Sequence, residues 1–221
     1  MSAEPKFIHI NTHSSFSLLE AIPSVKNLAV RAKEYNMPAL GIADTNNLFG
    51  AMEVCKYLPG EGVQPILGSQ VSVLVDGMGD PGLISLLVKN EKGWRNLLKI
   101  SSIAYLETPD GHDPEISLER LKDYSEGLIA LTGNAVEGLA GKVFREKGKG
   151  ALNQLTQDLE SVFTNNLYIE LQRHGMEQEI QLEPVLLDVA YNQNIPLVAS
   201  NDCRFLDKDQ AEAFDVMLCI K

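Results

Sequence analysis

Short apolar segments alternate with longer amphipathic stretches along the chain, and this alternation constrains the fold more than any other feature. The apolar segments have the length of β-strands, whereas the stretches between them repeat apolar residues at helical spacing. We predict strands at 7–10, 39–43, 64–75 (two pieces broken at Gly68), 83–88, 127–132, 167–171 and 196–200. We predict helices at about 24–36, 47–58, 91–106, 135–148, 151–163 and 177–194.

This βα alternation predicts an α/β fold with a parallel sheet, because parallel strands need a long crossover that is usually a helix. The nearly all-apolar strand 39–43 fits a strand that is buried on both faces. The pattern does not choose between a closed barrel and an open sheet. The sequence stops within the amphipathic stretch "AFDVMLCIK", which has no helix terminator. We therefore interpret residues 1–221 as one domain and as an N-terminal fragment of a longer chain.

Polar side chains follow most of the predicted strands. In either architecture the carboxyl ends of parallel strands are where a site forms. The residues at these positions are Asn11, His13, Asp44, Thr45, Gln70, Asn134, Gln172, His174, Asn201 and Asp202. We expect a polar cleft to be built from them.

The net charge of −11 comes from 19 basic and 30 acidic side chains. Such a surface repels phosphate backbones, so we expect no direct DNA binding by this chain. The sequence shows neither a signal peptide nor a membrane-spanning run. Cys55, Cys203 and Cys219 form no CxxC pair, which fits a reducing compartment. We expect a cytoplasmic protein without membrane contact.

The stretch "HINTHS" places His9 and His13 four residues apart with Asn11 midway between them. We interpret His13 as a hydrogen-bonded cleft residue rather than a metal ligand, and His9 as a packing residue. His112 lies in a polar turn and is expected to be exposed. The basic stretch 141–150 is expected to be a solvated helix end rather than a nucleic-acid site.

Several segments together resemble one family. They are "HINTHSSFSLLEA", "ALGIADTNNLFGAMEV", "VQPILGSQVSV", "VKNEKGWRNLLKISSIAY", "SEGLIALTGNAVEG", "YIELQRHG" and "IPLVASNDCRFL" with "AEAFDVMLCI". They occur in the order and spacing of the PHP (polymerase and histidinol phosphatase) domains that begin bacterial replicative DNA polymerase III alpha subunits. The resemblance implies a distorted seven-stranded (βα)7 TIM-like barrel. It also implies a cleft that, in active members, binds up to three divalent ions and hydrolyses phosphoesters.

The ligand positions of metal-binding members fall here mostly on poor cation ligands. Histidine is replaced by Asn11, Thr45, Leu83, Arg204 and Phe214, glutamate by Gln70, and cysteine or histidine by Asn134. The residues that persist are His13, Asp44, His174 and Asp202, with Glu20 where members often have aspartate. By this resemblance, the positions are the remains of a metal cleft.

Carboxamide and hydroxyl groups bind Zn²⁺ or Mn²⁺ far less well than imidazole, thiolate or carboxylate. Arg204 also adds a permanent positive charge where the family places a cation. We therefore predict no metal cofactor and no hydrolase activity. We also predict that the Arg204 guanidinium lies within hydrogen-bond reach of Asp44 or Asp202 and neutralises carboxylates that no ion neutralises.

The leading hypothesis that follows from the resemblance is a structural and docking module. It would stabilise the rest of the polymerase chain, whose DNA-directed DNA polymerase (nucleotidyltransferase) site lies outside these residues, and it would bind the separate proofreading exonuclease subunit during DNA replication. One alternative is an active metal-dependent phosphoesterase, a 3′–5′ exonuclease or pyrophosphatase, that uses Zn, Mn or Mg on His13, Asp44, His174 and Asp202. Another is a free-standing phosphatase of the histidinol phosphatase type.

Overall fold

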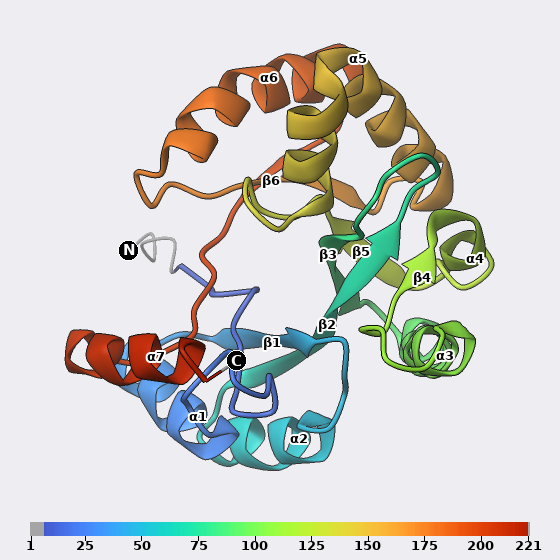
Figure 1. The fold of residues 1–221 in the computed structure, drawn as a ribbon. Coiled ribbons are helices and arrows are strands. Elements are labelled where there is room, and N and C mark those ends of the chain that lie inside the picture. Colours follow the sequence, from blue (N-terminus) through green and yellow to red (C-terminus); the bar gives the residue numbers. More distant parts are fainter. Residues whose placement is uncertain (1–6, 221) are drawn as a thin grey trace, which may run out of the picture. The chain divides into compact units, whose positions relative to one another are not determined.

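The structure is a computed structural model that describes residues 7–220. Its helices and strands divide between two compact units, which are described separately (Figure 1). Unit 1 consists of Met1–Ser69 and Asn201–Lys221, and unit 2 consists of Gln70–Ser200. Strand β2 (Gln64–Leu74) contains the junction, so its first residues belong to unit 1 and the others to unit 2. The chain has a mixed α/β fold.

Unit 1 packs two helices against a strand. Its elements are α1 (Val25–Glu34), β1 (Ala39–Thr45), α2 (Ala51–Gly60), the start of β2, a 3₁₀ turn η1 (Lys208–Gln210) and α7 (Ala211–Leu218). α1 begins where the sequence predicts, because the Ser24 side chain accepts a hydrogen bond from the backbone N–H of Asn27. The apolar faces of α1, β1 and α2 form one core that includes Val25, Leu28, Leu40, Ile42, Val54 and Leu58.

The predicted strand at 7–10 is wrong. This segment is extended, and among the described residues the backbone bonds that it and the following Thr12 form with β1 run from Gly41 N to His9 O and from Ala43 N to Thr12 O. The acceptors are three residues apart and the donors two, so one extra residue interrupts the ladder as in a β-bulge. Gly41 permits the close approach, because a Cβ there would lie 2.6 Å from the Ile10 carbonyl oxygen.

Unit 2 contains most of the strands that the structure describes. Its helices are α3 (Glu91–Glu107), α4 (Leu118–Lys122), α5 (Leu139–Val162) and α6 (Glu177–Gln193). Its strands, besides the end of β2, are β3 (Gly82–Val88), β4 (Ile116–Ser117), β5 (Leu128–Leu131), β6 (Leu167–Leu171) and β7 (Leu197–Ala199). In unit 2 the strand order is β2-β3-β5-β6-β7, and β4 pairs with β2. β4 and α4 were not predicted, because each has five residues or fewer.

The sheet of unit 2 is not all parallel, which corrects the prediction. β5, β6 and β7 run parallel to one another, but β3 runs antiparallel to β5, with Ser85 opposite Leu131 and Val88 opposite Leu128. The connection 75–81 between β2 and β3 is too short for a parallel crossover, which needs about a dozen residues. As a result, the first residues of β3 lie at the sheet edge where β5 ends.

One glycine was predicted to break a strand and does not, and a second glycine, for which no such role was predicted, kinks a helix. The predicted break at Gly68 is wrong, because β2 continues through it. Gly148, in contrast, has a φ of 79° and kinks α5 between the two predicted helices. The basic stretch 141–150 lies in α5 around this kink, where Lys142 Nζ donates to Pro81 O at 2.6 Å and Lys147 Nζ to Asp76 O at 3.1 Å. These two lysines connect α5 to the 75–81 connection through hydrogen bonds to its backbone.

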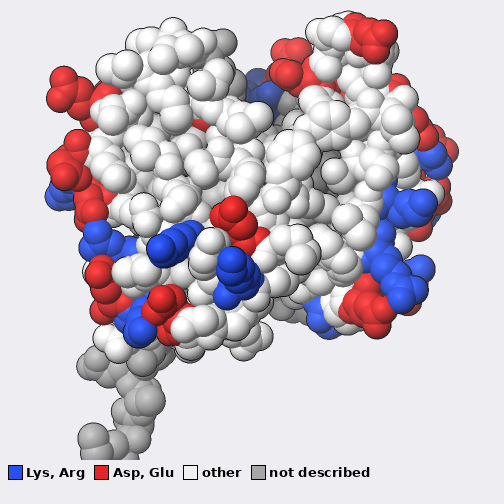
Figure 2. All heavy atoms as spheres, turned by 90° about the horizontal axis from the view of Figure 1, so that it is seen from below, with Lys and Arg blue, Asp and Glu red and all other residues white. Residues whose placement is uncertain are grey.

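Among the described residues, no helix has both the length and the apolar character needed to cross a bilayer. Figure 2 shows one face of the molecule, on which Lys and Arg side chains are interspersed with Asp and Glu and no basic area dominates. Absence of direct DNA binding stays a prediction.

Candidate functional site

Two extended segments of unit 1 hold its predicted site residues together. Thr12 and Cys203 form a parallel bridge, in which His13 N donates to Cys203 O at 2.9 Å and Cys203 N donates to Asn11 O at 3.3 Å. Thr12 also bridges to Ile42 of β1. The side chains next to Thr12 and Cys203 in sequence therefore gather on one face. There they form a cluster, the unit 1 cluster, made of His13, Ser14, Ser17, Glu20, Asp44, Thr45, Asp202 and Arg204.

Asp44 is the most enclosed carboxylate of this cluster, with 3% exposure. It follows the apolar part of β1 and accepts three hydrogen bonds, from Ser14 N at 2.7 Å, Ser14 Oγ at 2.8 Å and Ser17 Oγ at 2.6 Å. Three short bonds offset the cost of burying the charge. Asp44 is thus satisfied by the loop that follows the first extended segment.

The Arg204 guanidinium bridges two carboxylates, which confirms the prediction for Asp202. Its Nε lies 3.1 Å from both Asp202 oxygens, and its Nη1 lies 3.4 Å from Glu20 Oε2. These three side chains are only 13–19% exposed, so the pairs are poorly screened by solvent. Thr45 completes the arrangement, because its hydroxyl donates to the same Glu20 oxygen at 2.6 Å.

His13 is fully buried and links the two halves of the cluster. Its Nε2 lies 3.1 Å from Asp202 Oδ1, and its Nδ1 lies 3.0 Å from Ser17 Oγ. Burial alone would raise the pKa of Asp202, but the contact with His13 and the charge of Arg204 outweigh it and hold that pKa below its ordinary value. His13 is a hydrogen-bonded cleft residue, as predicted.

Two further predicted site residues of unit 1, Asn11 and Phe214, are part of its packed structure. Asn11 is buried with 1% exposure, on the extended segment that carries His13. Phe214 in α7 packs against Phe205, with ring centroids 5.5 Å apart. Phe214 therefore makes an aromatic contact at a position where the resemblance implies a metal ligand.

In unit 2, Asn134 organises the loop between β5 and α5. Its Oδ1 accepts hydrogen bonds from the backbone N–H groups of Val136, Glu137 and Gly138 at 2.8–3.0 Å. Leu83 lies beside this loop, because it bridges to Gly138 at the edge where β5 ends. Gln70 is buried within β2. The side-chain oxygen of Asn134 thus stabilises the backbone of the loop that contains it.

Replacing Asn134 by alanine should lower the free energy of unfolding by about 1–2 kcal/mol, as for the loss of a helix N-cap. Three N–H groups before α5 would lose their common acceptor. Urea denaturation followed by circular dichroism measures the change. Asn134→Asp keeps an acceptor oxygen and should stay within about 0.5 kcal/mol of wild type. Equal losses in both variants would contradict this role.

His174 pairs with Glu179, which was not among the predicted site residues. Glu179 in the first turn of α6 accepts from His174 N at 2.7 Å and Met176 N at 3.1 Å, and its Oε1 lies 2.8 Å from His174 Nδ1. Burial would raise the pKa of Glu179, but these hydrogen bonds from His174 and Met176 outweigh it and lower that pKa. His174 therefore holds the start of α6.

Because the folded state lowers the pKa of Glu179, this carboxylate stabilises the fold fully above its ordinary value of 4.5 and progressively less as the pH falls below it. The stability difference between wild type and Glu179→Gln should therefore shrink from pH 7 to pH 3. Urea denaturation at a series of pH values measures it. The exposed Glu212→Gln variant serves as the control. A difference that does not change with pH would contradict the assignment.

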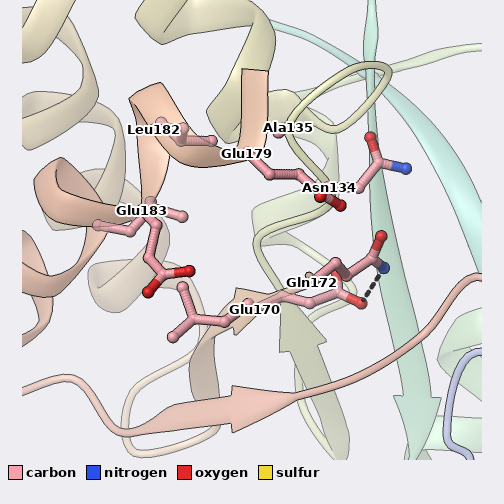
Figure 3. Close-up of a pocket in the computed structure, with 9 residues that line it drawn as sticks. Asn134, Ala135, Glu170, Gln172, Glu179, Leu182 and Glu183 are labelled. Atoms are coloured by element: carbon pink, nitrogen blue, oxygen red, sulfur yellow. Dashed lines mark hydrogen bonds between the residues drawn. The ribbon is translucent and has the colours of Figure 1, made fainter. Parts of the chain in front are cut away.

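Figure 3 shows the small pocket beside this pair, with Glu179 extending toward Asn134 and Gln172. Gln172 Nε2 donates to Glu170 Oε1 and to Ser200 Oγ, both at 3.1 Å, and the Ser200 hydroxyl donates to the same Glu170 oxygen. The free space is about 10 Å³, which is room for no more than a water molecule. The polar residues at this edge satisfy one another rather than surround a ligand.

The divalent ions that the family resemblance implies do not fit the donors of either unit. Among the described residues, no three His, Cys, Asp or Glu side chains are grouped so that they could hold an ion. In the unit 1 cluster, Arg204 and His13 already bind Asp202, and serine donors surround Asp44. The serines and Glu179 were not predicted as site residues, although the run "THSSFS" places three serines just after the first extended segment.

Solved structures place this fold in a class of α/β proteins. It is similar to a protein from Bifidobacterium adolescentis assigned as a metal-dependent phosphoesterase, with a TM-score of 0.57, 11% identity and coverage of 95% of this chain and 96% of that one. It is also similar to an amidohydrolase from Chromobacterium violaceum solved with sulfate and no metal, with a TM-score of 0.60, 12% identity and the same coverage.

The sequence comparison is more specific. Residues 9–174 match the family described as the PHP domain, and the chain belongs to this family. It is 37% identical to the DNA polymerase III subunit alpha of Caulobacter vibrioides, over 97% of this chain and 19% of that protein. The same protein of Borreliella burgdorferi is 34% identical, over 100% of this chain and 20% of its own length. The chain thus spans about a fifth of the length of these relatives.

Proposed function

We propose that this chain is the PHP region of a DNA polymerase III alpha subunit and that it works in DNA replication as a structural module. The relatives at 34–37% identity carry this name and align over nearly the whole chain. The polymerase site would lie in the parts of those longer proteins that this chain does not span. By the same resemblance, its surface would bind a separate proofreading exonuclease subunit.

One observation carries the structural role. Arg204 lies between Glu20 and Asp202, at positions where the resemblance places metal ligands and a bound cation. A guanidinium is always charged and binds carboxylates through a planar fork, so it can neutralise them permanently. It cannot activate water or accept electron pairs as a Lewis acid. The cluster would therefore stabilise the fold instead of cleaving phosphoesters.

Metal analysis of protein purified without chelators tests this proposal. We expect zinc, manganese and magnesium far below one equivalent in the PHP region, and no hydrolysis of a phosphodiester substrate that depends on Asp202. In the full-length polymerase, the Asp202→Ala variant separates this cluster from the polymerase site. Near-stoichiometric zinc or manganese that is lost in Asp202→Ala, together with hydrolysis that is lost in the same variant, would overturn the proposal.

Docking of the exonuclease needs its own experiment. Size-exclusion chromatography of the protein mixed with a purified 3′–5′ exonuclease subunit should show co-elution. Failure to co-elute at micromolar concentrations would remove this part of the proposal and leave the structural role intact.

We also propose that the strands close into a seven-stranded barrel and that the protein is cytoplasmic. The similarity to two solved structures over 95% of the chain supports the fold. Exposed free cysteines, Cys55 and Cys219, are compatible with a reducing compartment. A crystal structure with an open sheet would contradict the barrel.

A further inference from the structure

Helix α7 (Ala211–Leu218), which the structure describes in full, has no buried residue, although most of its side chains are apolar. Val216, Leu218 and Ile220 are 58%, 43% and 69% exposed. Ile220 extends the last turn, because its N–H donates to Met217 O at 3.1 Å. Single apolar side chains are common on protein surfaces, but several neighbouring ones on one short helix indicate a surface that another element covers.

The helical repeat brings exposed apolar side chains of α7 together. Residues three and four positions apart share one face of a helix. This rule defines an exposed stripe, the α7 stripe, made of Ala213, Val216 and Ile220. On one side the stripe borders Met217 and Phe214, which are half-buried, and on the other side it borders Glu212. Asp215 lies farther round the helix, away from the stripe. Unit 1 therefore covers only part of the apolar surface of α7.

The packing that unit 1 provides is small for a helix of this length. An eight-residue helix is not stable alone in water, because the cost of nucleation exceeds what its few hydrogen bonds return. Among the described residues, no side chain caps its N-terminus. Its aromatic contact joins Phe214 to Phe205, which is itself 38% exposed. Because helices in proteins depend mainly on packing of their apolar face, α7 needs a second packing partner.

We propose that the α7 stripe is covered, in the full-length protein, by an amphipathic segment of the same polypeptide that follows residue 221. The aligned relatives are much longer, since this chain spans only 19–20% of their length. A segment attached directly after α7 has a high local concentration at the stripe, which lowers the cost of docking. Its apolar side chains pack on the stripe, and a lysine or arginine at its edge pairs with Glu212.

The other two occupants match this surface less well. A second copy brings another net charge of −11, and a symmetric contact through the stripe places the two Glu212 carboxylates close together. A separate subunit must give up its translational and rotational freedom to bind, whereas a segment of the same chain gives up much less. This inference rests on the proposed function, because it requires that the chain is a region of a longer polymerase.

Cysteine labelling of the full-length polymerase tests the proposal. Ala213→Cys and Val216→Cys place a thiol on the stripe, and Asp215→Cys places one on the exposed side of the same helix as a control. The rate of reaction with N-ethylmaleimide is measured by mass spectrometry of the peptide and divided by the rate in urea. Both stripe cysteines should react at least about tenfold more slowly than the control, since the segment must first open. Equal rates would overturn the proposal.

The same labelling distinguishes the three occupants. Slow reaction of the stripe cysteines should persist when the protein is diluted and should need no added subunit. Protection that disappears on dilution would assign the stripe to a second copy. Protection that appears only when a purified exonuclease subunit is added would assign it to that subunit. Either result would overturn the proposal.

Hydrogen exchange of the unmodified full-length protein needs no substitution. Peptides that cover residues 213–220 should exchange at least about tenfold more slowly than those from the exposed turn 109–113. Exchange as fast as in this turn would show that α7 opens freely and would overturn the proposal. Neither measurement involves Asp202 or the metal content of the unit 1 cluster. Failure of this inference is therefore distinguishable from failure of the proposed function.

Discussion

Arg204→Met should lower the free energy of unfolding by about 3 kcal/mol. The change removes the guanidinium from between Glu20 and Asp202 and leaves two largely buried carboxylates without their cation. Breaking a buried ion pair by removing one partner costs about 3–5 kcal/mol, and the slight solvent exposure of these side chains places the expected loss at the lower end. Urea denaturation of wild type and variant at pH 7 measures the difference.

A matched control comes from Arg95, whose pair with Glu91 on α3 is 73–77% exposed. Arg95→Met should change stability by less than about 1 kcal/mol. Adding Glu20→Gln to Arg204→Met should restore part of the loss, because it removes one of the uncompensated charges. If Arg204→Met is as stable as Arg95→Met, the guanidinium does not hold the cluster together and the proposed structural role fails.

Asp44→Ala should destabilise the protein by about 3–5 kcal/mol, the other large effect that we expect. Three buried donors, on Ser14 and Ser17, would lose their acceptor, and each buried unsatisfied group costs about 1–3 kcal/mol. Water that enters the space left by the carboxylate accepts hydrogen bonds from these donors and so offsets part of the loss in stability. Thermal and urea denaturation followed by circular dichroism measure the loss.

Asp44→Asn separates the contribution of hydrogen bonding to stability from that of charge, and Asp158→Ala serves as a control. Asp44→Asn keeps one acceptor oxygen and the shape of the side chain, so it should lose about half as much stability as Asp44→Ala. Asp158 on α5 is exposed, and its side chain accepts a hydrogen bond from Gln154 at 3.0 Å. Asp158→Ala should stay within about 0.5 kcal/mol of wild type. A similar loss at Asp44 and Asp158 would contradict the buried network.

Part of the site could be predicted from the sequence because it depends on charge. Asp202 and Arg204 are two residues apart on an extended segment, so they share a face, and opposite charges on one face pair. The partners of Asp44 could not be predicted in this way. Ser14 and Ser17 lie about thirty residues away, and serine forms hydrogen bonds in so many settings that its type alone indicates no partner.

The fold, like the site, could be predicted from the sequence only in part. The apolar strands and amphipathic helices were predicted because burial imposes their periodicity, as at β6 and α3. The direction of β3 was missed because strand direction depends on the length of the connection rather than on the side-chain pattern, and the seven residues 75–81 are too few for a parallel crossover. The segment 7–10 was predicted as a strand because its side chains alternate, but a ladder also needs a regular backbone register, which side-chain patterns do not encode.

Unit 1 is assembled from two stretches that the ribosome makes at different times. Cys203 is 194 residues downstream of His9, and all of unit 2 is synthesised between the two stretches. The N-terminal strand-like segment must therefore remain without its Cys203 partner while the whole middle of the chain is synthesised and begins to fold. We expect nascent chains halted before residue 201 to protect α5 and β6 from proteases while leaving the first extended segment open to cleavage.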